Sequence, residues 1–175
     1  MKTETYEGLK KISDKYEQTK EFGKLSQQLL ALAFGLAGFK VNEVRLVEGV
    51  DIDVKAQSGE KYAVEVKTTR SNSSSIIFGK KDIDGLQKRK EDGYQPLLAV
   101  LRLDRFSDWI FAKADTIKPG SISLDSIRVY RLHELEKCIC PSFDEAIKEH
   151  YNGIMREGQK YLDNILREKR VKVRR

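Results

Sequence analysis

Two segments of alternating polarity, joined by a glycine turn, constrain this fold more than any other feature of the chain. Residues 49–56 and 61–67 alternate apolar and polar side chains, which is the pattern of strands that bury one face. Ser58-Gly59 between them favours a tight turn. The sequence therefore predicts an antiparallel hairpin with one apolar face and one charged face.

The charged face brings acidic side chains together. Its members are Asp51, Asp53, Glu65 and Lys67. Residues two apart on a strand share a face, so the register of the hairpin decides which aspartate meets Glu65. A loop of residues 57–59, with Gly59 left-handed, would place Asp51 opposite Glu65, whereas a loop of residues 58–60 would place Asp53 there. Both registers gather three carboxylates and one ammonium, and a two-residue loop would scatter them.

Such a cluster is suited to a hard divalent cation. Neighbouring carboxylates repel and raise one another's pKa, and a bound cation removes that cost. All-oxygen ligands favour Mg²⁺ or Mn²⁺ over zinc. The metal can polarise a phosphoryl oxygen and lower the pKa of a bound water. Lys67 would position or deprotonate that water, or neutralise charge on the phosphate. The competing interpretation is an amphipathic hairpin whose polar face has no chemical role.

The periodicity of the remaining chain predicts helices before the hairpin and a mixture of strands and helices after it. The expected helices cover residues 6–38, with a break near 20–23, then 81–92, and most of the chain from residue 142 onward. The expected further strands cover residues 39–44, 97–103, 109–112 and 127–132. Residues 71–75 are small and polar, which is typical of a loop.

This order predicts an α/β fold, with a mixed central sheet flanked by helices and an additional C-terminal helical region. We expect one α/β domain in residues 1–141, with its core in about 22–112, and a helical extension in 142–175. The apolar side chains of the extension either form a dimer face or fold back on the sheet. They are Tyr151, Met155, Tyr161, Leu162, Ile165 and Leu166.

At this point the sequence resembles a known family. The run Gly49-Val50-Asp51-Ile52-Asp53, followed by Tyr62-Ala63-Val64-Glu65-Val66-Lys67, resembles the PD-(D/E)xK nuclease superfamily, which has the restriction-endonuclease-like fold. The arrangement is most similar to the archaeal Holliday-junction resolvases, including the Gly38-Phe39 pair and the Trp109 strand. The resemblance covers about residues 22–112.

The resemblance implies that one hairpin aspartate and Glu65 bind metal and that Lys67 is catalytic. By spacing to Glu65, Asp53 fits best, and by its Gly-Val-Asp-Ile context, Asp51 fits. Both are kept, with a preference for Asp53. Such nucleases often carry a glutamate on the first helix, where this chain has Gln27. A neutral amide is a weaker ligand, so Gln27 binds a metal-held water, or the site uses a single metal.

The partner expected from these features is DNA. Hydroxyl, amide and cationic side chains that follow the hairpin suit phosphate contacts. They are Thr68, Arg70, Lys80, Lys81, Gln87 and Arg89. The chain has a net charge of +6, and residues 165–175 contain six cations and one anion. This basic tract either collects phosphates or is a solvated tail.

No apolar run approaches the roughly 20 residues that span a bilayer, and the N-terminus lacks the apolar stretch of a signal peptide. We therefore expect a cytoplasmic protein with no membrane association and no small-molecule cofactor. A homodimer is expected if the resolvase resemblance holds.

These observations predict a metal-dependent DNA endonuclease that hydrolyses phosphodiester bonds with Mg²⁺ or Mn²⁺. The resemblance to resolvases further implies selectivity for the shape of the DNA. Two alternatives stay open. One is a non-catalytic nucleic-acid-binding module on the same fold, which Gln27 supports. The other is a nuclease that processes RNA or single strands, because a fold alone does not determine the reaction.

Overall fold

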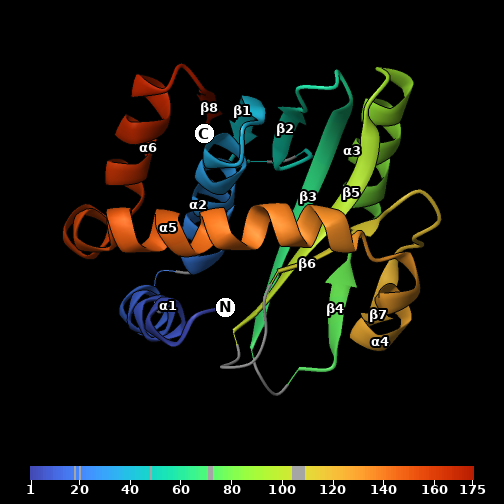
Figure 1. Ribbon diagram of the computed structural model, residues 1–175. Helices are drawn as coiled ribbons and strands as arrows, with labels where there is room; N and C mark the ends of the chain where they lie inside the picture. Colours follow the sequence, from blue (N-terminus) through green and yellow to red (C-terminus); the bar gives the residue numbers. More distant parts are fainter. Residues whose placement is uncertain (18, 20, 48, 71–72, 104–108) are drawn as a thin grey trace.

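The computed structural model describes the chain except for residues 18, 20, 48, 71–72 and 104–108. Its helices and strands alternate irregularly along the sequence (Figure 1). The helices are α1 (Thr3–Tyr16), α2 (Phe22–Leu36), α3 (Lys80–Glu91), α4 (Leu124–Ile127), η1 (Arg128–Tyr130), α5 (His133–Glu157) and α6 (Gln159–Glu168). The strands are β1 (Lys40–Arg45), β2 (Ile52–Lys55), β3 (Lys61–Arg70), β4 (Ser75–Phe78), β5 (Gln95–Leu103), β6 (Trp109–Lys113), β7 (Gly120–Ser123) and β8 (Lys172–Arg174).

A six-stranded mixed sheet forms the centre, in the order β6-β5-β3-β2-β1-β8. β3 runs parallel to β5, and β1 runs parallel to β8, while the other neighbours are antiparallel. β4 and β7 form a separate antiparallel pair. The expected α/β class, with a mixed sheet flanked by helices and further C-terminal helices, is confirmed.

The hairpin of β2 and β3 adopts the first of the two expected registers. Ile52 pairs with Val64, so the next pair outward is Asp51 with Glu65. The Ala56 N–H donates to the Glu60 carbonyl at 2.8 Å, which leaves residues 57–59 as the loop. Gly59 has a φ of +101°, a left-handed conformation that glycine adopts without steric cost. The turn chemistry therefore determines which aspartate faces Glu65.

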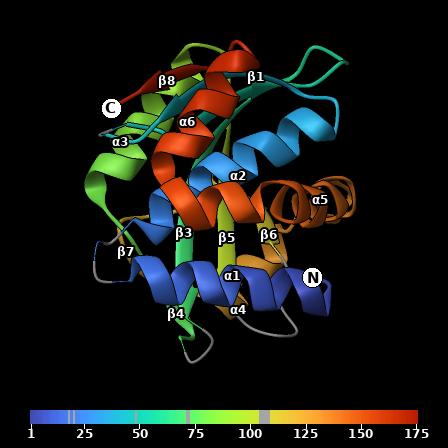
Figure 2. The same ribbon diagram turned by 90° about the vertical axis from the view of Figure 1, so that its left-hand side faces the viewer.

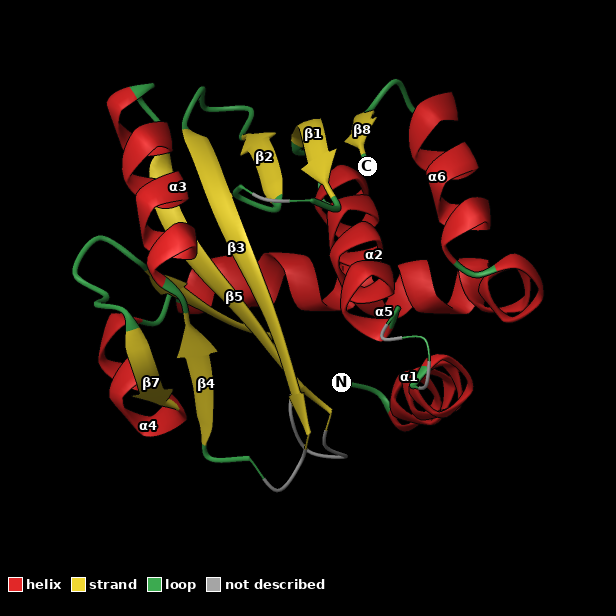
Figure 3. Cartoon of the chain, turned by 180° about the vertical axis from the view of Figure 1, so that it is seen from behind, coloured by secondary structure: helices red, strands yellow, loops and turns green. Residues whose placement is uncertain are grey.

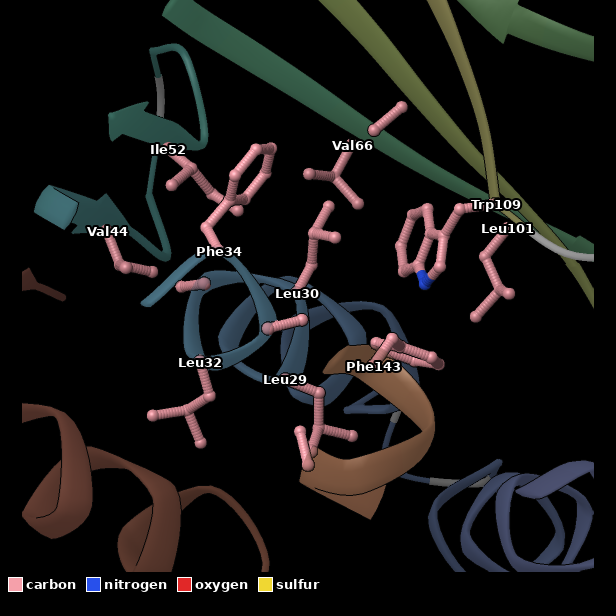
Figure 4. Close-up of a cluster of buried hydrophobic side chains, with 14 of the residues drawn as sticks. Leu29, Leu30, Leu32, Phe34, Val44, Ile52, Val66, Leu101, Trp109 and Phe143 are labelled. Atoms are coloured by element: carbon pink, nitrogen blue, oxygen red, sulfur yellow. The ribbon is translucent and has the colours of Figure 1, made fainter. Parts of the chain in front are cut away.

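One face of the sheet carries the main hydrophobic core. α2 packs on β1, β2 and β3, and α1, α5 and α6 pack around α2 on the same side (Figure 2). Figure 4 shows Leu30 and Phe34 of α2 among Ile52, Val66 and Trp109 of the sheet, and all five are buried. Burial of α2 on nearly all sides explains why its sequence is so rich in alanine and leucine.

The opposite face is covered only in part. α3 packs on β3 and β5, and a second apolar cluster lies beneath it and beside β4 and β7. In Figure 3 α3 lies in front of β5, whereas none of the described helices lies in front of β2, β1 and β8. The charged side of the hairpin faces this partly open side.

The C-terminal helices pack against the rest of the chain. Residues 141 and 142 both lie within α5, and Leu162 and Leu166 of α6 are completely buried in the main core. These two side chains therefore fold back on the core. The basic tract is not a solvated tail, because residues 172–174 form β8 beside β1.

Two expectations on secondary structure are wrong. Residues 127–132 form no strand: Ser123 caps α4 by accepting a hydrogen bond from the Asp125 N–H, and Leu124 and Ile127 are buried at helical spacing. α5 begins at residue 133 instead of 142, and Pro141 lies inside it on an exposed position. No helix among the described residues is long and apolar enough to cross a membrane.

Candidate active site

Asp51 and Glu65 form the centre of the candidate site. They lie opposite each other at the point where β2 begins beside β3, and they are 6% and 3% exposed. One carboxylate oxygen of Asp51 accepts a hydrogen bond from the Val66 N–H at 2.7 Å. The side chain of Asp51 thereby continues the ladder between the two strands, which fixes its orientation.

Lys67 lies two residues beyond Glu65 on the same face of β3. Its ammonium donates to Glu65 at 2.9 Å and to Asp82, on the first turn of α3, at 2.7 Å. It also lies 5.5 Å from the centre of the Phe78 ring on β4. The Gly79 N–H donates to the same Asp82 oxygen at 2.8 Å, so the start of α3 orients this carboxylate. We call Gln27, Asp51, Glu65, Lys67 and Asp82 the carboxylate site.

In the carboxylate site the acidic side chains outnumber the cationic ones. Burial raises the pKa of Asp51 to about 7, although the Val66 N–H, Lys67 and Gln27 oppose this rise. Burial and the neighbouring Asp51 charge raise the pKa of Glu65 to about 8. One ammonium therefore does not compensate the acidic groups around it, and an added cation would favour the ionised form of both carboxyls.

The site also contains buried oxygens without a hydrogen-bond donor. Oε2 of Glu65 and Oε1 of Gln27 are both buried and unpartnered among the described residues. Gln27 lies on α2, and its side chain hydrogen-bonds Asp51. Unpartnered buried oxygens are costly, and a hard cation or its water would satisfy them. The donor set therefore fits Mg²⁺ or Mn²⁺.

The expected group of three carboxylates is not formed. Within the described ranges, no three His, Cys, Asp or Glu side chains make a group able to hold a metal ion. Asp53 is the absent member: the register places it opposite Ala63, two residue pairs away from Glu65. A cation here would have the carboxylates of Asp51 and Glu65, with an amide and water completing its ligands.

Asp53 belongs to a different group of charges. Its carboxylate accepts one hydrogen bond from Arg45, at 2.6 Å, and two from Arg89, one of them at 3.2 Å from Nε. Arg45 also ion-pairs with Glu43, and Glu43 contacts two cations of β8. We call this group the arginine network. Its members are Glu43, Arg45, Asp53, Arg89, Lys172 and Arg174.

In the arginine network the cations outweigh the acids. Burial raises the pKa of Glu43, but Arg45, Lys172 and Arg174 together lower it below its ordinary value. Asp53 is 1% exposed and already held by two guanidinium groups. The structure therefore places Asp51 opposite Glu65 and places Asp53 in the arginine network, and Asp51, which the Gly-Val-Asp-Ile context also suggested, is the aspartate that we propose below as metal ligand.

The candidate nucleic-acid contacts are dispersed. Lys80, Lys81 and Gln87 are exposed on α3. Arg89 stacks on Tyr94 and pairs with Asp53, so its role is structural. Thr68 lines a small cleft beside α1 and α2, on the face of β3 away from Lys67. The side chain of Arg70 lies outside the described residues.

Three site residues were absent from the sequence-based set. Asp82 and Phe78 contact Lys67, and Arg45 holds Asp53. Asp82 had a detectable signal, because an aspartate three residues after Gly79 marks a helix start close behind the hairpin. Phe78 had none, since β4 forms only by pairing with the distant β7.

Comparison with known proteins finds similarity in structure but no matching family model or curated sequence. No protein-family model matches the chain, and no curated protein matches it. Among solved structures it is similar to the 1.6 Å structure of Hjc, a Holliday junction resolvase from the archaeal hyperthermophile Archaeoglobus fulgidus. The TM-score is 0.46 and the sequence identity 17%, over 61% of this chain and 93% of that chain. The function proposed below is supported by the side chains of the site.

Proposed function

We propose that this chain is a metal-dependent DNA endonuclease that hydrolyses phosphodiester bonds at the carboxylate site. The observation that carries the proposal is the facing pair Asp51 and Glu65, buried, underneutralised and accompanied by unpartnered oxygens. Structural ion pairs lower carboxyl pKa values, whereas this pair is left with raised ones. Perturbed carboxyls gathered beside an ammonium are typical of a functional site.

Asp51, Glu65 and the amide of Gln27 would hold Mg²⁺ or Mn²⁺. When bound, such an ion polarises a phosphoryl oxygen and makes a bound water more acidic. Asp51 is held by the Val66 N–H and by Gln27, and Glu65 is held by Lys67, which leaves Oε2 of Glu65 for a further ligand. The backbone of the hairpin therefore preorganises the ligand atoms.

Lys67 acts as a charged group in this proposal. Burial lowers the pKa of its ammonium, but Glu65 and Asp82 outweigh this effect and the pKa is raised. A lysine that keeps its proton cannot serve as a general base at neutral pH. Its role is to neutralise the negative charge that develops on the phosphate in the transition state.

Asp82 is a positioning residue in this arrangement. Burial raises its pKa, but Lys67 and the Gly79 N–H outweigh burial and the pKa is lowered, so Asp82 stays ionised. Together with the Phe78 ring it restricts where the Lys67 ammonium can lie. An ammonium with fixed partners is better oriented toward a substrate phosphate than a free one.

One observation favours the alternative of a binding module. Gln27 supplies a neutral amide where an acidic ligand would bind a cation more strongly, and the described residues offer no third acidic ligand. A module of this kind would bind DNA and leave it intact. The two functions differ in whether DNA is cut, and the same variants separate them.

The experiment is a nicking assay on plasmid, linear and single-stranded DNA with Mg²⁺, Mn²⁺ or chelator. Wild type is compared with Glu65→Gln and Lys67→Ala, and with Glu60→Gln as a control that changes an exposed carboxylate in the hairpin loop. Cleavage that needs metal, is lost in both site variants and persists in the control supports the nuclease. Binding without cleavage in wild type overturns it and supports the module. A homodimer stays a prediction, which the oligomeric state in solution would test.

A further inference from the structure

The side chains of four strands form a row across the sheet, and this row joins the carboxylate site to β8. Glu65 lies opposite Asp51, and the Arg45 N–H donates to the Asp51 carbonyl at 2.8 Å. Arg45 in turn pairs with Arg174 on β8. Neighbouring strands lie about 4.8 Å apart, so Arg174 is about 14 Å from Glu65 along the row. The row is acidic at one end and cationic at the other.

The cationic end is accessible. Lys172 and Arg174 have side chains that are 61% and 53% exposed, and both contact Glu43. Arg45 contacts the same carboxylate, so three cations surround one acid. Positive charge therefore remains for a further anion, although each cation already has a partner.

A second row of cations lies on the same face, nearer the hairpin loop. Lys61 pairs with Lys55, and Lys55 pairs with Lys40, so the three side chains share one side of the sheet. All three are exposed. We call Lys40, Arg45, Lys55, Lys61, Lys172 and Arg174 the basic sheet face. None of the described helices lies in front of β2, β1 and β8 on this side (Figure 3).

We infer that the basic sheet face binds the second backbone of a duplex whose first backbone lies at the carboxylate site, so that the substrate is double-stranded DNA. The inference rests on the proposed function. The grooves of duplex DNA are about 6 and 12 Å wide, which suits two backbone contacts about 14 Å apart. Cations spread over two rows match a broad polyanion.

The chemistry of the face favours a duplex over a single strand. Surfaces for single strands combine a basic groove with aromatic side chains on which bases stack. The two rows contain only lysine, arginine and carboxylate side chains, and the Tyr94 ring beside Lys61 is already stacked against the Arg89 guanidinium. Contacts of this kind bind phosphates and do not read base sequence. β8 therefore contributes affinity for a duplex without sequence specificity.

The test measures binding in chelator, where metal-dependent cleavage does not interfere, as a function of salt. The variant is Lys172→Gln with Arg174→Gln, and the matched control is Lys160→Gln with Arg167→Gln, which removes two exposed cations from α6 on the opposite side of the sheet. We expect the variant to lower the salt slope for a short duplex by about 1.8, since each phosphate contact contributes about 0.9. Duplex affinity should fall by on the order of tenfold, while single-strand binding and the control should change little.

A charge-preserving variant guards against loss of folding. Lys172→Arg with Arg174→Lys keeps both cations in β8, so it should restore the wild-type slope if charge is what matters. An unchanged duplex slope in the glutamine variant would overturn the inference. An equal loss for duplex and single strand would also overturn it, in favour of a single-strand track.

Failure of the proposed function would give a different result. If no metal supports cleavage of any DNA, the nuclease proposal is wrong, while the loss of duplex binding in the glutamine variant would still establish the basic sheet face as the binding surface. If wild type cleaves with Mg²⁺ but the glutamine variant binds and cleaves duplex as wild type does, the nuclease stands and the inference is overturned.

Discussion

Asp51 and Asp53 are two residues apart on one strand and point to the same side of the sheet, yet their surroundings are opposite. Asp51 faces another carboxylate, Glu65, and burial raises the pKa of both. Asp53 faces two guanidinium groups, from Arg45 and Arg89. Both aspartates are almost completely buried, so the difference lies in their partners and not in their exposure to water.

The comparison separates two uses of buried charge. In the arginine network the carboxylates are neutralised by cations of the protein, and removal of one partner would leave a buried charge uncompensated. In the carboxylate site the protein does not fully neutralise the acids, which can bind a cation from solution. Without that cation their repulsion lowers the stability of the fold. Such a cost is expected where a site binds a ligand, because groups placed for function oppose the most stable arrangement.

The largest expected effect is on cleavage. Asp51→Asn should lower the rate of DNA nicking with Mg²⁺ by about a thousandfold. The loss of a ligand carboxylate removes about 4 kcal/mol of metal-assisted stabilisation of the transition state. Asp53→Asn, assayed under conditions where it is folded, should stay within about tenfold of wild type. The measurement is the single-turnover rate for both variants at saturating metal.

The pair of variants is its own control, since each changes the same functional group on the same strand. A large loss in Asp53→Asn together with a small one in Asp51→Asn would reverse the assignment of the two aspartates. Circular dichroism of both variants would show that the comparison concerns folded protein.

The second effect is on stability and has the opposite order. Asp53→Asn should lower the free energy of unfolding by about 3 kcal/mol, because Arg45 and Arg89 lose the charge that compensates them in a buried position. Asp51→Asn, measured in chelator, should leave stability unchanged or raise it, because the substitution removes repulsion from Glu65. Urea denaturation of both variants gives the two values. Equal destabilisation would contradict the distinction between the two sites.

The hairpin could be predicted from the sequence because its determinants are local. Alternating polarity fixed which residues share a face, and the loop around Gly59 limited the register to two choices. The choice between them required the structure, since both loops use the same glycine. The same local logic found α2, α3, β5 and β6.

The elements that were missed depend on distant partners. β4 and β7 are short strands that pair with each other across more than forty residues, and neither is marked by alternation. β8 consists of Lys172, Val173 and Arg174, a composition that reads as a solvated tail. It becomes a strand because β1 offers an unpaired edge and Glu43 attracts its cations. Intrinsic strand preference is a weak guide in such cases.

The partners of Asp53 could not be predicted for a similar reason. Spacing along the chain gives the distance from Asp53 to Glu65 but not the position of Arg45 on β1 or of Arg89 on α3. Arg89, which the sequence suggested as a phosphate contact, pairs with Asp53 in the structure. Arginines on other helices and strands determine which carboxylates are neutralised within the protein, and only the tertiary structure shows where these arginines lie.

A smaller effect is expected for the positioning residue of the carboxylate site. Asp82→Asn should lower kcat by about tenfold with little change in KM, because Lys67 keeps its bond to Glu65 but loses the partner that orients it from α3. Asp82→Glu retains the charge and should recover part of the loss. The control is Asp84→Asn, an exposed acid on the same helix.

A loss in Asp82→Asn that appears only in KM would indicate a role in binding, and one matched by lower thermal stability in all Asp82 variants would indicate a structural role. Either result would remove Asp82 from the orientation of Lys67. The comparison with Asp84 shows whether the charge itself or its place beside the ammonium matters.

The smallest effect is the dependence of stability on pH in chelator. The pKa values of Asp51 and Glu65 are raised to about 7 and about 8 in the folded state, so the folded protein binds these protons more tightly than the unfolded chain does. The stability that these two groups contribute is complete below the ordinary carboxyl pKa and is lost as pH rises through the folded values.

The variant Glu65→Gln removes the acid, so its melting temperature relative to wild type should rise between pH 4 and pH 8, the range that these pKa values define. The expected gain is at least about 1 kcal/mol, or roughly 3 °C. Because Glu43 and Asp82 have lowered pKa values and act in the opposite direction, the difference between the two proteins is the quantity to measure. A difference that stays constant over this range would show that the acids of the carboxylate site are compensated within the protein, as those of the arginine network are, and a pH-dependent difference that persists unchanged in excess Mg²⁺ would show that the site does not bind the ion.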